Sequence, residues 1–197
     1  NTFCYEEKLA AEARGISVYE VCNEMVASLP PGGAVIFHPF LFGSNVQANA
    51  RAGFYGLGSW HSKAHLLRAL YEGVVYGHLE HVNRLKAAGA TMEHPARITG
   101  GGARSQVWSQ MFADVLELPI ETPAASEIAA LGAAMAAGIG AGVYASYADA
   151  VAQTVHIVHR YEPQPEATAR YLARYQEYLG LVEAMREPWR RLEKLND

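Results

Sequence analysis

Residues Ile98–Gln110 read ITGGGARSQVWSQ, with three successive glycines, Gly100, Gly101 and Gly102, at the centre of the stretch. The residues before the glycines have the character of a short strand, and those after Arg104 have the apolar spacing of a helix. A glycine turn between a strand and a helix lets backbone N–H groups approach an anion, and the helix N-terminus adds a favourable dipole. Glycines also leave room for a flat ring. The stretch therefore predicts a strand, turn and helix unit suited to a nucleotide.

The residues of this unit leave two other interpretations open. One is a flexible turn that holds no ligand. The other is a dinucleotide fold, because Gly100 and Gly102 follow a strand and Glu121 stands 19 residues beyond Gly102. Ser105 occupies the place of the third glycine in that fingerprint, however, and the unit lies in the middle of the chain, after long helices. The spacing of a Walker-type loop is not present in the sequence.

Strand and helix patterns alternate along the chain, which favours an α/β fold. Helices are predicted for residues 5–13, 17–29, 61–88, 105–116, 126–141, 146–153 and 165–195, and strands for residues 34–37, 96–99, 119–122 and 155–158. The last helix is expected to be interrupted near Pro188. Ser126 and Glu127 are expected to begin the Ala-rich helix, and residues 39–57 are predicted to form an irregular loop.

Composition limits the classes of function that the chain can have. The 197 residues are 50% hydrophobic and 18% charged, with a net charge of -4 and scattered Lys and Arg. These values predict a sizeable core and no nucleic-acid partner. The apolar stretches are rich in Ala and Gly, and we predict no membrane span. Cys4 and Cys22 are too few for a disulfide framework, which favours reduced thiols and a cytoplasmic location. Because the sequence begins with Asn1 and not Met, we expect a fragment of a longer protein.

Several side chains in the predicted helix 61–88 invite a functional interpretation. His61 and His65 share one helical face, as do His78 and His81. Neither pair has a third ligand at a suitable spacing or a glutamate in the H-E-x-x-H arrangement, so we predict no metal site. Glu72, in the middle of the same helix, is expected to make a hydrogen bond or an ion pair.

Three strings of residues, taken together, resemble motifs of the FGGY family of carbohydrate kinases. They are Ile98–Gln110, which resembles the adenosine-binding motif; Ala52–Leu57 with His65–Glu72, which resembles the C-terminal signature; and Glu127–Ala134, which resembles the Ala-rich helix. The resemblance covers essentially the whole chain. Within the family, residues 37–57 resemble the L-xylulose kinase-like branch.

The resemblance implies a fold and a domain organisation. Residues 1–197 are expected to form the C-terminal domain of an actin-like, ribonuclease H-like ATPase, an α/β domain with a mixed sheet flanked by helices. A preceding domain of the same polypeptide would supply an acidic phosphate-binding motif, most sugar contacts and the general-base aspartate. No catalytic residue is therefore assigned to this chain, and the isolated chain is expected to be inactive. The sugar would lie in the interdomain cleft, and a homodimer is possible, since dimers are common in the family.

The resemblance also assigns a nucleotide site. Its residues are Gly100, Gly101, Gly102, Ala103, Ser105 and Gln106. Gly101, Gly102 and Ala103 would line the adenosine and the α-phosphate, and Gln106 stands where a polar side chain meets the adenine in related kinases. From the residues alone, Ser105 is predicted to cap the following helix, and Gln106 can equally be a solvated residue of its first turn.

Neighbouring residues are expected to have structural roles. Arg104 is expected to be a solvated cation near the phosphates. Trp108 and Phe112 share one helical face, which predicts packing in the core and not stacking on a base. Ser44 and Asn45 replace the Glu-Arg pair that follows the glycine in the commoner form of the family's loop. Contacts of better-known xylulose kinases are therefore not transferred to this loop.

The implied activity is ATP-dependent phosphorylation of a sugar, a ketopentose such as L-xylulose, to the 5-phosphate, with ATP and Mg²⁺ as cofactors. This chain would supply the ATP-binding half of the enzyme. An actin-like nucleotide-dependent switch or scaffold would share the fold without needing a sugar site. A dinucleotide-binding module is the third possibility.

Overall fold

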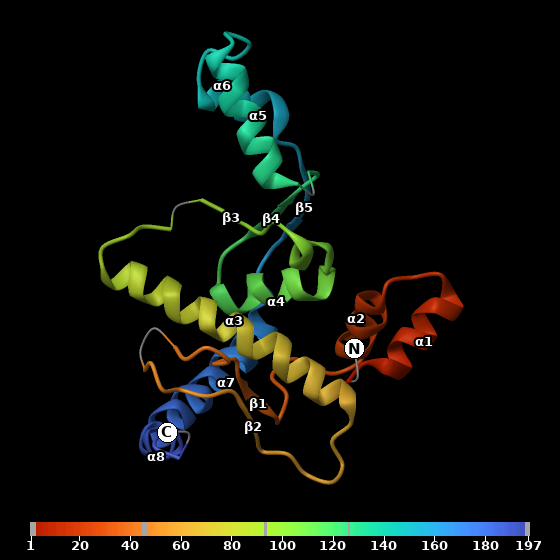
Figure 1. Ribbon diagram of the computed structural model, residues 1–197, viewed down its shortest axis with the longest axis vertical. Helices are drawn as coiled ribbons and strands as arrows, with labels where there is room; N and C mark the ends of the chain where they lie inside the picture. The colour runs from red at the N-terminus through yellow and green to blue at the C-terminus, as the bar shows by residue number, and fades with distance from the viewer. Residues whose placement is uncertain (1–2, 45–46, 93, 126, 196–197) are drawn as a thin grey trace.

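The computed structural model describes residues 3–44, 47–92, 94–125 and 127–195. Helices flank two small sheets, as the expected mixed α/β fold requires (Figure 1). In chain order the elements are α1 (Tyr5–Arg14), α2 (Val18–Ala27), β1 (Ile36–His38), β2 (Gly53–Tyr55), α3 (Lys63–Ala87), β3 (Ala96–Arg97), the 3₁₀ turn η1 (Gly101–Arg104), α4 (Gln106–Leu116), β4 (Ile120–Pro123), α5 (Ile128–Gly140), α6 (Tyr147–Thr154), β5 (Ile157–Tyr161), α7 (Pro165–Ala184) and α8 (Arg186–Glu193).

Helices α1 and α2 form a hairpin whose turn follows from its sequence. Gly15 ends α1 in the left-handed region, at φ 65°, which glycine adopts without steric cost. Ser17 begins α2 with a capping box, in which its own backbone N–H donates to Glu20 over 2.7 Å. Arg14 also forms a two-pronged ion pair with Glu24, at 2.6 and 2.7 Å. The hairpin thus holds α2 in a defined place beside α3.

The first sheet consists of β1 and β2, which pair antiparallel with Phe37 opposite Phe54. Strand β1 lies against α3, and the two backbones come close at Gly73. A Cβ atom at Gly73 would collide with the backbone oxygen of Phe37, so glycine is required there. This close contact fixes the sheet on the long helix that also borders the candidate site.

The second sheet has the strand order β3-β4-β5. Strand β3 pairs parallel with β4, with Ala96 opposite Ile120, and β4 pairs antiparallel with β5, with Ile120 opposite Tyr161. Helix α4 connects the two parallel strands, and α3 and α7 pack against α4. This arrangement places the glycine turn at the carboxyl end of β3, where open α/β sheets hold ligands.

The main core lies between α2, α3, α4, α7 and the two sheets. Its most deeply buried members include Val26, Val75, Tyr76, Met111, Val115, Ile120, Tyr178 and Trp189. Burial of these side chains provides the main apolar stabilisation of the fold.

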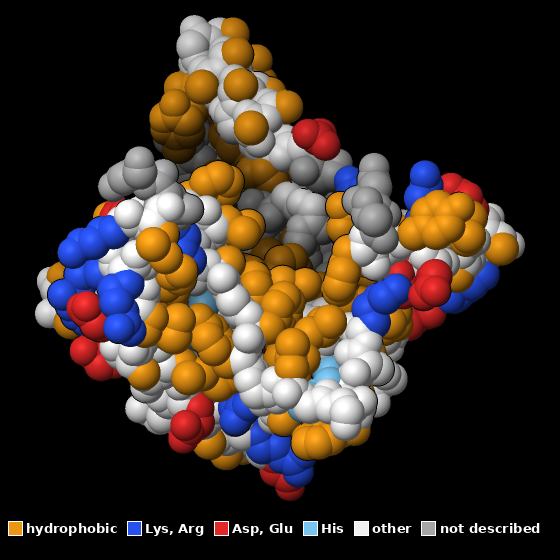
Figure 2. Space-filling model, turned by 60° about the horizontal axis from the view of Figure 1, so that its bottom comes forward, with side chains coloured by type: hydrophobic (Ala, Val, Ile, Leu, Met, Phe, Trp, Pro, Cys, Tyr) orange, Lys and Arg blue, Asp and Glu red, His pale blue; other side chains and the backbone are white. Residues whose placement is uncertain are grey.

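Helices α5 and α6 form a hairpin that projects from β4 and β5 (Figure 1). Met135 is the buried residue of α5 and Ala150 that of α6, and apolar side chains are exposed along the projection (Figure 2). None of the helices in the described part of the chain combines the length and the apolar character that a bilayer span needs.

The predicted helices and strands are present within a few residues of their predicted bounds, and one strand was not predicted. Strand β2 lies in residues 39–57, which were predicted to be irregular, because its pairing with β1 stabilises three residues that carry no strand pattern of their own. The predicted break in the C-terminal helix near Pro188 is present, at Met185, and Pro188 itself lies in the first turn of α8, where its missing N–H is tolerated. Strand β5 begins at Ile157, two residues later than predicted. The predicted helix start at Ser126 and the loop residue Asn45 lie outside the described residues.

Candidate nucleotide-binding site

The glycine turn has the geometry of a backbone cradle. Gly100 adopts φ +82°, a conformation that glycine tolerates and other residues rarely adopt, and Gly101–Arg104 then form one 3₁₀ turn. A Cβ atom at Gly101 would meet no other group within 4 Å, so the space beside it is open. Ser105 ends the turn and begins α4, because its Oγ accepts the backbone N–H of Trp108 over 3.1 Å. The predicted cap is therefore confirmed.

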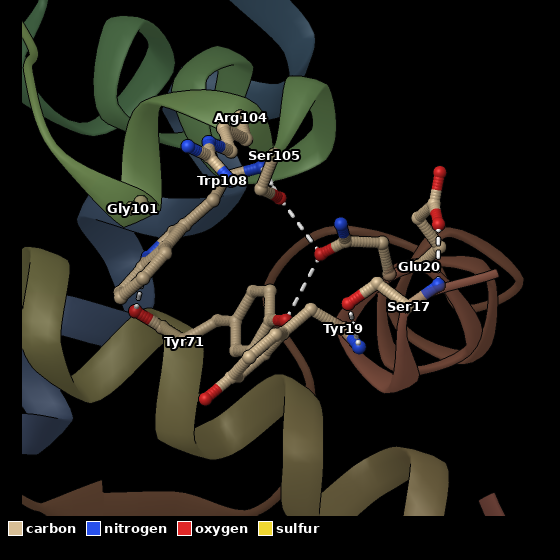
Figure 3. A pocket seen from close by; sticks show the side chains of 10 residues that line it. Ser17, Tyr19, Glu20, Tyr71, Gly101, Arg104, Ser105 and Trp108 are labelled. Carbon is tan, nitrogen blue, oxygen red and sulfur yellow. Dashed lines mark hydrogen bonds between the residues drawn. The ribbon is translucent and has the colours of Figure 1, made fainter. Parts of the chain in front are cut away.

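A cavity of about 540 Å³ opens beside this turn, between α2, α3 and the start of α4 (Figure 3). Its lining residues are Ser17, Tyr19, Glu20, Asn23, Tyr71, Gly101, Gly102, Arg104, Ser105 and Trp108. The volume lies within the range of about 300–1,000 Å³ that is usual for small-molecule sites. The cavity combines backbone of the glycine turn, aromatic side chains and a few polar groups.

One polar cluster joins the three helices that surround the cavity. The Oδ1 atom of Asn23 accepts the hydroxyl of Ser105 over 2.7 Å and the phenol of Tyr71 over 2.9 Å. Burial raises the pKa of Tyr71 to about 12, so the phenol keeps its proton at neutral pH and donates. The cluster therefore fixes the position of the glycine turn relative to α2 and α3.

Two aromatic rings provide a flat apolar surface in the same cavity. The rings of Tyr71 and Trp108 lie 4.9 Å apart between centroids at an interplanar angle of 30°, and Trp108 donates its indole N–H to the backbone oxygen of Tyr71 over 3.3 Å. Phe112 packs on Trp108 and on His78, against the core. Both Trp108 and Phe112 are half-buried and pack against the core, as predicted, and Trp108 also lines the cavity.

A second, smaller cavity of about 200 Å³ lies against other residues of the glycine turn and the carboxyl end of β4. Gly100, Ala103 and Gln106 line this second cavity, and Arg104, which is exposed, borders both cavities. The predicted site residues therefore fall into two groups. Gly101, Gly102 and Ser105 line the larger cavity, and the other three line the smaller one.

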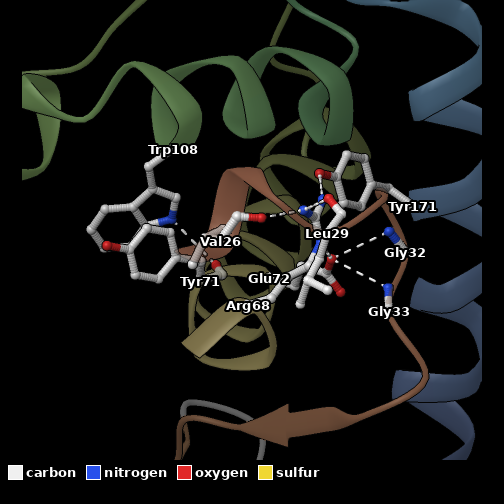
Figure 4. A network of polar contacts seen from close by, with 9 residues as sticks. All are labelled: Val26, Leu29, Gly32, Gly33, Arg68, Tyr71, Glu72, Trp108 and Tyr171. Atoms are coloured by element: carbon white, nitrogen blue, oxygen red, sulfur yellow. Dashed lines mark hydrogen bonds and ion pairs between the residues drawn. The ribbon is translucent and has the colours of Figure 1, made fainter. Parts of the chain in front are cut away.

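A buried ion pair supports the element that carries Tyr71 (Figure 4). Arg68 and Glu72, both on α3, are joined over 2.8 Å, and Arg68 also donates to backbone oxygens of Val26 and Leu29 at the end of α2. Glu72 accepts backbone N–H groups of the turn at residues 32–33. The predicted ion pair of Glu72 is confirmed, and through Arg68 it connects α3 with the end of α2.

Other residues that invited a functional interpretation serve local structure. Glu121 is held between Arg97 and Arg160, at 3.2 and 3.3 Å, which does not favour a role as the ribose ligand of a dinucleotide site. His61 Nδ1 accepts the backbone N–H of Gly58. His65 Nδ1 accepts the backbone N–H of Ser62, the residue before α3. These contacts give both side chains a local structural role.

Asn23, Tyr19 and Tyr71 line the cavity without having been assigned to it from the sequence. They lie on helices distant in sequence from the glycine run, and Asn23 is separated from Ser105 by 82 residues. No sequence motif includes Asn23 or Tyr19. Tyr71 belongs to the string His65–Glu72, which resembles a family signature, but the helical spacing of this string predicts only packing.

Replacement of Ser105 with alanine is expected to lower the free energy of unfolding by about 1–2 kcal/mol, since the helix cap and the hydrogen bond to Asn23 are both lost. Equilibrium urea unfolding measures the change. Replacement of the exposed Ser28 with alanine removes one hydroxyl contact, to the backbone oxygen of Met25, and is expected to have a smaller effect. Equal effects of the two replacements would contradict a capping role for Ser105.

Comparisons with known proteins identify the family of the chain. The chain matches the FGGY family of carbohydrate kinases, C-terminal domain, over residues 4–141. It is 44% identical over 168 residues to the L-xylulose/3-keto-L-gulonate kinase of Escherichia coli K12, and 36% identical over 174 residues to a probable L-xylulose kinase of Haemophilus influenzae. Each alignment covers 85% of this chain and 34% of the relative. The chain therefore spans about a third of the length of these curated relatives.

Solved structures show the same fold. The crystal structure of xylulose kinase from Rhodospirillum rubrum superposes with a TM-score of 0.77 at 29% sequence identity, over 95% of this chain and 38% of that one. The expected actin-like ATPase architecture is thereby confirmed. On the family match, the sequence identities and the fold together, this chain belongs to the FGGY family of carbohydrate kinases, and residues 4–141 correspond to the C-terminal domain of that family.

Proposed function

We propose that the protein phosphorylates a sugar with ATP, and that this chain holds the nucleotide beside the glycine turn. The observation that carries the proposal is the position of the 540 Å³ cavity, which lies against Gly101 and Gly102 in a chain of the FGGY family. The apolar faces of Tyr71 and Trp108 suit a nucleobase, and the turn with the N-terminus of α4 suits a phosphate.

The residues present fit ATP better than they fit a metal ion. Within the described ranges, no group of three His, Cys, Asp or Glu side chains comes together to hold a metal. We therefore expect Mg²⁺ to be carried on the phosphates of ATP, where it neutralises charge during transfer. We expect Arg104, which is exposed at the edge of the cavity, to be a solvated cation near the phosphate chain. A contact of Gln106 with adenine stays a prediction, because Gln106 lines the smaller cavity.

The sugar and the general base are proposed to come from outside this chain. The matched relatives extend far beyond the aligned third, and the remainder can supply a second domain, a sugar site and the base. The names of these relatives favour L-xylulose, a ketopentose, as the substrate. Phosphorylation at its 5-position stays a prediction. A cytoplasmic location and a homodimer stay predictions. A coupled kinase assay of the full-length protein with ketopentoses and aldonates tests the proposal, and turnover of none of them would contradict it.

Replacement of Gly101 with leucine is expected to weaken ADP binding by roughly tenfold or more, about 1.4 kcal/mol, because the new side chain enters the open space of the cavity. Calorimetric titration of the full-length protein with ADP measures the change. Gly132 is a matched control, since a Cβ atom there also meets nothing within 4 Å and the residue lies on α5, outside the lining of the cavity. Equal affinities of the two variants would place the nucleotide elsewhere.

A further inference from the structure

The orientation of the Asn23 carboxamide is set by two hydroxyl groups. Ser105 Oγ accepts the backbone N–H of Trp108, which leaves the hydroxyl hydrogen of Ser105 to be donated to Asn23 Oδ1 over 2.7 Å. The protonated phenol of Tyr71 donates to the same oxygen over 2.9 Å. Figure 3 shows these two contacts converging on one oxygen atom between Ser105 and Tyr71. Because both partners donate, the end of the amide that they meet is the oxygen.

The other end of this carboxamide is available to a ligand. Among the described residues, none accepts a hydrogen bond from the Nδ2 group of Asn23. Asn23 is half-buried and lines the 540 Å³ cavity, together with Tyr71 and Gly101. A carboxamide whose oxygen is occupied presents only its two N–H donors. The cavity therefore contains a fixed amide NH₂ group, with two N–H donors, beside its aromatic wall.

We propose that Asn23 selects the nucleobase by donating to an accepting ring nitrogen of a purine. This inference rests on the proposed function, in which the cavity holds the base of ATP. Asparagine usually recognises adenine with both its oxygen and its nitrogen. Here the oxygen is engaged by Ser105 and Tyr71, so that only the donating half can recognise a base. Asn23 thus acts as a specificity-determining residue and not as a catalytic residue.

Replacement of Asn23 with aspartate tests the donor directly. A carboxylate keeps an oxygen for the hydroxyls of Ser105 and Tyr71, and puts a second, negatively charged oxygen in the place of the N–H donors. ADP binding by the full-length protein is expected to weaken by roughly ten- to a hundredfold, since a hydrogen bond becomes a repulsion. Asn83→Asp, the same chemical change at an exposed position of α3 outside the cavity, is expected to leave ADP affinity unchanged.

A second measurement separates base recognition from a structural role. ADP analogues that lack one ring nitrogen, 1-deaza-, 3-deaza- and 7-deaza-ADP, are titrated against the wild type and Asn23→Asp. The wild type is expected to lose roughly tenfold in affinity for one analogue, and the variant is expected to lose nothing further for that same analogue. Equal losses in both proteins for every analogue would overturn the inference.

The outcomes also distinguish this inference from the proposed function. A wild-type protein that binds none of these nucleotides would contradict both. A wild-type protein that binds ADP, with Asn23→Asp binding it equally well, would overturn only the role of Asn23. Thermal melting of both variants checks that each is folded before the affinities are compared.

Discussion

Replacement of Arg68 with leucine is expected to lower the free energy of unfolding by about 3–5 kcal/mol. Arg68 is 4% exposed and its partner Glu72 is 2% exposed. Burial raises the pKa of Glu72, and the guanidinium of Arg68 counteracts that effect. Without Arg68, Glu72 becomes an uncompensated buried charge, and Tyr171 loses the guanidinium contact that it makes over 2.6 Å. Equilibrium urea unfolding measures the loss.

Two further variants show whether the ion pair or only the packing is responsible. Exchange of both Arg68 and Glu72 for leucine is expected to destabilise the protein by less than Arg68→Leu alone, because no buried charge is left unpaired. Arg84→Leu breaks the exposed ion pair with Glu80 on the same helix, and an effect of about 1 kcal/mol or less is expected. If Arg84→Leu were as harmful as Arg68→Leu, burial of the pair would not be the cause.

The glycine unit could be predicted from the sequence because its determinants are local. The strand character before Gly100, the glycine run and the cap at Ser105 occupy consecutive residues, and the structure realises them in the same order. Ser105 could be recognised as a cap because its hydroxyl bonds a backbone N–H only three residues away. The capping box at Ser17 is determined over the same short distance.

The cavity beside this unit could not be predicted in the same way. Tyr71 reaches Asn23 across 48 residues of sequence, and Ser105 reaches it across 82. These partners meet because α3 packs on both α2 and α4, which is a consequence of the tertiary fold. For the same reason, the sequence could not show that Gly101 and Gln106 line different cavities.

The free energy of unfolding is expected to fall by about 3 kcal/mol between pH 7 and pH 4 because of His38 alone, which binds a proton more readily in the unfolded chain than in the folded one. The ring is fully buried among Phe40, Tyr55, Tyr178 and Trp189, none of which carries a charge at these pH values. Burial lowers the pKa of His38 from 6.5 to about 4. Between pH 6.5 and pH 4, His38 is therefore protonated in the unfolded chain but neutral in the folded chain. Stability is lost as the pH falls through this window.

The local contacts of His38 explain why its pKa is lowered in the folded state. Nε2 lies 3.2 Å from the backbone oxygen of Tyr178, whereas Nδ1, the atom that would gain the proton, has no acceptor among the described residues. His38→Phe removes the titrating group and keeps a ring in the aromatic cluster. Between pH 7 and pH 4, the variant is expected to lose about 3 kcal/mol less unfolding free energy than the wild type. His156→Phe, at an exposed position, is expected to keep the dependence of the wild type. The carboxyl groups are the same in all three proteins, so the difference between their unfolding free energies, measured by urea unfolding at each pH, isolates His38. An equal loss of stability with falling pH in the wild type and His38→Phe would show that His38 does not govern acid stability.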